Sequence, residues 1–151
     1  MNSKTKAIIA WVLVSIWAAA IYNFSTDAFN TGRTLQAIET VGIHGHLANS
    51  INHVARKSAH FTEYAILGLL ASITALACWP RIYLYRGPVL VMVCCSLYAL
   101  SDEAHQVFVP SRGPAVKDVI LDLFGAGFAI YAFYRFNAAQ RLAPVEEEAP
   151  A

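Results

Sequence analysis

Carboxylates, histidines and basic side chains, the groups that move protons and bind anions, gather in three short segments of this 151-residue chain. The segments are RKSAHFTEY at residues 56–64, SDEAHQ at 101–106 and KDVILD at 117–122. Within each segment, ionisable residues recur at spacings of three or four, so they share one face of a helix. Lys57 and His60 are one such pair. The pattern is typical of helices that meet around a polar site.

The elements that must position these segments are long apolar stretches. Hydrophobic residues make up 57% of the chain and charged residues only 14%, whereas about a quarter of a soluble domain is charged. The mean hydropathy is +0.46. Four stretches reach the length of a membrane-crossing helix. We therefore expect an all-α, small polytopic membrane bundle of about four transmembrane helices, with spans near residues 7–24, 58–79, 88–109 and 116–136.

The connections between the spans also carry patterns. In the first loop, Leu47, Ile51 and Val54 recur at helical spacing, which predicts a short amphipathic helix at the membrane interface. PRIYLYRG at residues 80–87 predicts a short basic turn. In the last span, Gly125 and Gly127 favour close packing between helices.

Basic residues give the orientation. With the N-terminus inside, the inner segments hold a small excess of lysine and arginine, which favours cytoplasmic termini. Residues 137–151, which are acidic and rich in proline, then form a disordered cytoplasmic tail. Antiparallel spans bring the start of the second, the end of the third and the start of the fourth to the outer face.

The three polar segments therefore predict one pocket near the outer leaflet. A charged side chain within a bilayer costs a few kcal/mol or more, so such groups face one another or water. The alternative is a solvated rim of ion pairs, and snorkelling alone explains Arg56 and Lys117. The candidate ligand-binding residues are Lys57, His60, Glu63, Tyr64, Asp102, Glu103, Gln106, Arg112, Asp118 and Asp122.

Four motifs carry a resemblance to a known family. HFTEY, SDEAHQ with the nearby VPSR, KDVILDLFGAGFA and the FSTD after the first span are similar to the VanZ-like membrane proteins over residues 7–135. The resemblance implies a VanZ-like transmembrane domain, residues 1–136, in a bacterial inner membrane. The founding member of that family is associated with low-level resistance to the glycopeptide teicoplanin. The family's polar positions correspond to Lys57, His60, Glu63, Tyr64, Ser101, Asp102, Glu103, Gln106, Arg112, Asp118 and Gly125.

The leading functional hypothesis is a binding protein of the cell envelope. Its partners are membrane lipids, and its ligand is an anionic lipid, a lipid-linked cell-wall precursor or a lipoglycopeptide. Lys57 and Arg112 supply positive donors, and His60 and Gln106 orient the ligand. The net charge of +1 gives no reason to expect nucleic acid. The sequence leaves the oligomeric state open.

Two alternatives use the same residues. An enzyme acting on a lipid-linked substrate would use Glu103 with His105, or Asp102 with His60, as acid and base. A metal site is the other, but no spacing matches a closed zinc set or HExxH, so we expect neither metal nor cofactor. The oxygen and nitrogen ligands of such a site would be Asp102, Glu103, His105, Asp118, Asp122 and His60.

Overall fold

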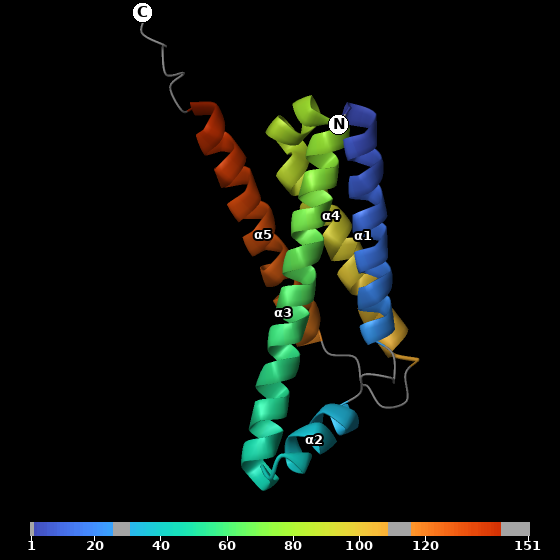
Figure 1. The fold of residues 1–151 in the computed structure, drawn as a ribbon, viewed down its shortest axis with the longest axis vertical. Coiled ribbons are helices and arrows are strands. Elements are labelled where there is room, and N and C mark those ends of the chain that lie inside the picture. Colours follow the sequence, from blue (N-terminus) through green and yellow to red (C-terminus); the bar gives the residue numbers. More distant parts are fainter. Residues whose placement is uncertain (1, 26–30, 109–115, 143–151) are drawn as a thin grey trace, which may run out of the picture.

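Four long helices form the body of the protein (Figure 1). The computed structural model describes residues 2–25, 31–108 and 116–142, and these residues form five helices and no strand. Four of the helices are long and apolar enough to cross a membrane, and they run antiparallel, with α1 beginning and α5 ending at the same end. The predicted all-α bundle is confirmed. The helices are α1 (Ser3–Phe24), α2 (Thr31–Thr40), α3 (Gly45–Cys78), α4 (Pro80–Gln106) and α5 (Val116–Leu142).

Helix α3 is the centre of the bundle and contacts each of the other four helices. Its 34 residues extend over about 51 Å, well beyond the roughly 30 Å of a bilayer's hydrocarbon core. The helical spacing of Leu47, Ile51 and Val54 is correct, but these residues belong to the first turns of α3 and not to a separate interfacial helix. No proline interrupts this stretch, so the helix continues into the span. The short helix of the first loop is α2.

The start of α4 differs from the prediction. Helix α4 begins at Pro80, so the basic turn predicted at residues 80–87 is wrong, and Trp79 alone separates α3 from α4. Proline is favourable at the first position of a helix because its fixed φ angle is helical, and because an N–H at that position would have no hydrogen-bond partner within the helix. The second proline, Pro88, lies inside α4.

The ends of the last two spans also differ from the predicted boundaries. Helix α4 ends at Gln106, before the predicted boundary at 109. Helix α5 continues to Leu142, so the part of the predicted disordered tail that the structure describes, residues 137–142, is helical. The remainder of that tail lies outside the described residues.

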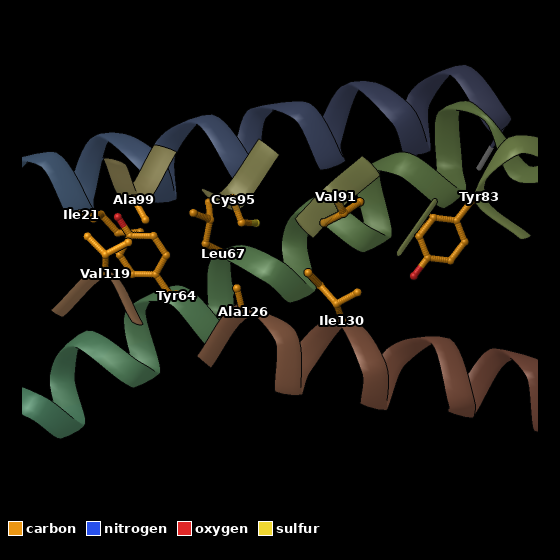
Figure 2. Close-up of a cluster of buried hydrophobic side chains, with 10 residues drawn as sticks. All are labelled: Ile21, Tyr64, Leu67, Tyr83, Val91, Cys95, Ala99, Val119, Ala126 and Ile130. Carbon is orange, nitrogen blue, oxygen red and sulfur yellow. The ribbon is translucent and has the colours of Figure 1, made fainter. Parts of the chain in front are cut away.

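Small residues allow α3 and α5 to pack backbone to backbone. A Cβ atom on Gly125 would lie 2.2 Å from the carbonyl oxygen of Phe61, and one on Gly68 would lie 2.8 Å from that of Ala126. Gly125 therefore has the predicted packing role, whereas a Cβ on Gly127 meets only side-chain atoms of Met92, at 3.9 Å and beyond. Around this interface lies the buried apolar cluster of Figure 2, formed by Ile21, Tyr64, Leu67, Tyr83, Val91, Cys95, Ala99, Val119, Ala126 and Ile130.

Two side chains attach α1 to its neighbours. The indole Nε1 of Trp17 donates a hydrogen bond of 2.9 Å to the carbonyl oxygen of Glu63 on α3. The hydroxyl of Tyr98 on α4 donates one of 2.6 Å to the carbonyl oxygen of Ala18. Both bonds cross between helices, and they fix where the last turn of α1 ends. That end supplies one wall of the candidate site.

Candidate functional site

The best-satisfied polar group of the site is the carboxylate of Asp102. The Ser25 hydroxyl, one residue beyond α1, donates to its Oδ1 at 2.5 Å. The Gln106 amide donates to its Oδ2 at 3.1 Å, one helical turn along α4. Asp102 is only 4% exposed, so both bonds offset the cost of removing a carboxylate from water. This cluster ties the end of α1 to the end of α4.

A second buried pair joins α3 to α5. His60 Nδ1 lies 3.4 Å from Asp122 Oδ1, and both side chains are almost completely buried. Neither atom has a hydrogen bond of good geometry within the described parts of the chain. The pair links the first half of α3 to the first half of α5 inside the bundle.

Tyr64 lies between the two aspartates. It is 0% exposed and packs among Ile21, Ala99 and Val119 (Figure 2). Its hydroxyl is within electrostatic range of Asp102 and Asp122, yet it has no hydrogen-bond partner among the described residues. A buried hydroxyl without a hydrogen-bond partner costs free energy.

The ion pair of Lys57 and Asp118 forms the rim. The ammonium of Lys57 contacts Oδ1 of Asp118, one turn before His60 and Asp122 along their respective helices. About a third of the Lys57 side chain is exposed, so this pair lies at the surface of the bundle. Because Asp118 compensates its charge, Lys57 is a weaker anion donor than its sequence position suggests.

A cavity of about 290 Å³ opens beside these pairs, and we call it the polar cavity because charged and hydroxyl-bearing residues are among those that line it. The end of α1, helix α2 and the first half of α3 enclose it, and a hydrogen bond of 2.6 Å from Thr34 to Asn52 attaches α2 to α3. The wall includes the guanidinium-bearing side chain of Arg56 and not the side chain of Lys57. The lining residues are Phe24, Ser25, Thr34, Ala55, Arg56, Ala59, His60 and Glu63.

The structure brings several of the predicted residues together in pairs, but of those that it describes only His60 and Glu63 line the polar cavity. His60 lies beside Asp122 and not beside Asp102, which is held instead by Ser25 and Gln106. The other predicted acid–base pair is not in the cavity wall: Glu103 is half-buried, and His105 packs against Tyr22 with ring centroids 4.4 Å apart. Of the remaining predicted residues, Glu63 lines the cavity and Arg112 lies outside the described residues.

Three residues of the site were missed from the sequence. Ser25 belongs to the FSTD motif that follows the first span, and that motif was the available signal. Arg56 was attributed to snorkelling, and Thr34 had no signal because its role depends on how α2 folds back. Within the described residues, no group of three or more histidine, cysteine, aspartate or glutamate side chains is arranged to hold a metal ion.

Comparison with known proteins identifies the family. The model of the VanZ/LLP1 family matches residues 7–137, which include all three polar segments and nearly all of the four long helices. No curated protein and no solved structure matches the chain. The motifs that resembled this family are those that supply Ser25, His60, Asp102 and Asp122 to the site. The chain is therefore a membrane protein of the VanZ/LLP1 family, with four candidate membrane spans.

Proposed function

We propose that this protein binds the head group of an anionic membrane lipid or of a lipid-linked cell-wall precursor in the polar cavity. The observation that carries the proposal is that Arg56 and His60 line one small cavity together with the hydroxyl groups of Ser25 and Thr34. The volume, about 290 Å³, lies at the lower end of ligand sites, which suits a head group and not a whole lipid.

The donors in the wall match the chemistry of a phosphate. An arginine guanidinium presents a planar fork of N–H groups that pairs with two phosphate oxygens. The imidazole of His60 adds a second hydrogen-bonding group to the wall. The hydroxyl oxygens of Ser25 and Thr34, whose protons are donated to Asp102 and Asn52, can accept hydrogen bonds from the hydroxyl groups of a glycerol or sugar.

The basic residues support a position at the outer leaflet of a bacterial inner membrane. Lys4 and Lys6 begin α1, and Arg81 and Arg86 lie in the first turns of α4. These ends lie at the opposite end of the bundle from α2 (Figure 1), and α2 borders the cavity. Lysine and arginine are enriched on the cytoplasmic side, so both termini are cytoplasmic and the cavity faces outward. A precursor held there would be withheld from teicoplanin, and expression would lower susceptibility to that drug.

A second candidate function is catalysis on the bound lipid. One observation favours it: His60 lines the cavity and its Nδ1 lies 3.4 Å from the carboxylate of Asp122, an approach that would become a positioning hydrogen bond for a general base if it shortened. The acid–base pair to test is then His60 with Asp122, in place of Glu103 with His105.

Native mass spectrometry tests the binding function. Protein released from detergent micelles should retain one anionic lipid, and Arg56→Ala or His60→Ala should lose it. His53→Ala is the matched control because His53 is an exposed histidine of the same helix outside the cavity wall. Retention of the lipid by both cavity variants would contradict the proposal.

Lipid extracts separate binding from catalysis. Extracts of membranes with wild-type protein, with Asp122→Asn and without the protein are compared by mass spectrometry. A lipid that is chemically altered only by the wild-type protein would make this an enzyme and name its substrate. An unchanged lipid profile with a co-purifying lipid favours binding.

A further inference from the structure

A second, larger cavity lies between α1, α3 and α4, and we call it the apolar groove. Its volume is about 510 Å³, and the residues that shape it include Trp11, Ala18, Ala71, Ala75, Leu90 and Cys94. All three helices are candidate membrane spans, so the groove faces the hydrocarbon of the bilayer. The small alanine side chains leave this space open where larger residues would have filled it.

The lining of the groove offers almost nothing to a polar ligand. Four lining residues carry hydroxyl groups, Ser15, Thr74, Tyr83 and Tyr98. The hydroxyls of Thr74 and Tyr98 already donate to the carbonyl oxygens of Leu70 and Ala18, at 2.8 and 2.6 Å. Few polar groups are therefore left to hold water, so the groove suits an apolar occupant.

The groove is aligned with the polar cavity. Ser25 borders the cavity and Ala18 the groove, seven residues apart on one face of α1. On α3, His60 borders the cavity and Leu67 borders the groove, again seven residues apart on one face of the helix. Tyr64 lies one turn from each of these residues along α3, and it is fully buried between them without lining either cavity.

We propose that the ligand is an amphiphile with a long hydrocarbon chain, whose chain occupies the apolar groove while its head group occupies the polar cavity. The inference rests on the proposed function and names the class of ligand. From His60 to Ala75 the path follows about 22 Å of helix axis, which requires a long chain and excludes a soluble head group alone.

Photo-crosslinking with a phosphatidylglycerol that carries a diazirine on one acyl chain tests this placement. In membranes that contain the wild-type protein, crosslinks should map to Leu90 and Cys94 several-fold more often than to Phe128 and Tyr131, which are exposed on α5. This map needs no variant. Equal crosslinking of the two surfaces would mean that the chain is ordinary surrounding lipid, and would overturn the inference.

Variants separate the chain from the head group in the same assay. Ala71→Phe fills the groove and should abolish the groove crosslinks, whereas the matched control Ala132→Phe places the same ring on an exposed position of α5 and should not. His60→Ala should also reduce the groove crosslinks.

Loss of the groove crosslinks with His60→Ala but not with Ala71→Phe would overturn the groove assignment alone. Loss with Ala71→Phe but not with His60→Ala would overturn the head-group function instead. Crosslinks between two protein copies at the groove would make a second copy the occupant and overturn the inference.

Discussion

The hydroxyl of Ser25 and the carboxylate of Asp102, 77 residues apart in the chain, are joined by a hydrogen bond of 2.5 Å. Ser25 is the first residue beyond α1, and Asp102 lies on the last turns of α4. Because Ser25 also lines the polar cavity, the bond makes the end of a membrane span part of the cavity wall. The position of α1 therefore controls the shape of the site.

Replacing Ser25 by alanine removes that bond and leaves a buried carboxylate with Gln106 as its hydrogen-bond donor. We expect Ser25→Ala to lower the free energy of unfolding by about 1.5–3 kcal/mol, as for hydrogen bonds to charged groups. The measurement is reversible unfolding in detergent micelles. Ser58→Ala, at an exposed position, is the control and should change stability by less than about 0.5 kcal/mol. Equal stabilities of the two variants would show that the bond contributes nothing.

His60 and Asp122 should behave as one energetic unit. A double-mutant cycle of His60→Gln and Asp122→Asn, read by the same unfolding measurement, should give a coupling energy of about 0.5–3 kcal/mol. The reason is that Asp122→Asn removes the charge opposite a buried imidazole, so its cost falls once His60 is gone. Additive effects of the two substitutions would show that the 3.4 Å approach is not an interaction.

Replacement by alanine should have very different effects on stability at the two glycines of α5. Gly125→Ala places a Cβ 2.2 Å from the Phe61 carbonyl oxygen, which is backbone and cannot move aside without separating α3 from α5. We expect a loss of about 1–3 kcal/mol of stability, or more if the helices separate. Gly127→Ala adds the same methyl group where the nearest atom is 3.9 Å away, and should be neutral or slightly stabilising. Similar stabilities would contradict the close approach of the two helices.

The rim pair Lys57 and Asp118 should tolerate a swap of the two charges, but not the reversal of one charge alone. Lys57→Glu should lower stability, and adding Asp118→Lys should restore most of the loss. The coupling should not exceed about 1 kcal/mol and should weaken with salt, because the pair is partly exposed. No restoration by the second substitution would indicate that the two side chains do not pair in the membrane-bound protein.

The orientation is open to direct labelling. The three native cysteines are first replaced by alanine. Two single-cysteine variants are then made, His46→Cys at the start of α3 and Arg81→Cys at the start of α4, and these positions lie at opposite ends of the bundle. A membrane-impermeant maleimide added to intact spheroplasts should label the first and not the second. The reverse pattern would place the polar cavity at the cytoplasmic face.

Composition and length were sufficient to predict the four long helices. Apolar runs of spanning length permit little else in a membrane, where every backbone polar group must be satisfied within the helix. Boundaries were less predictable. A proline at residue 80 was interpreted as part of a turn although it begins α4, because the same residue type both ends one helix and begins the next.

The candidate site was predictable in its members and not in its pairings. Spacing placed His60, Asp102 and Asp122 in one region, but which carboxylate faces the histidine depends on the rotation of α3 against α5. That rotation is fixed by the approach at Gly68 and Gly125, a tertiary feature. The role of Arg56 likewise depends on where α2 folds, which no local pattern encodes.

The central claim, that the polar cavity binds an anionic head group, is tested most directly by an equilibrium titration. Purified protein in nanodiscs of zwitterionic lipid is titrated with a water-soluble, short-chain phosphatidylglycerol. Wild type should bind saturably, and Arg56→Ala should weaken binding by at least about tenfold, the equivalent of one charge-assisted hydrogen bond. Arg81→Ala, an exposed arginine at the opposite end of the bundle, should bind as wild type does. Equal affinities for all three proteins, or no saturable binding by any of them, would contradict the claim.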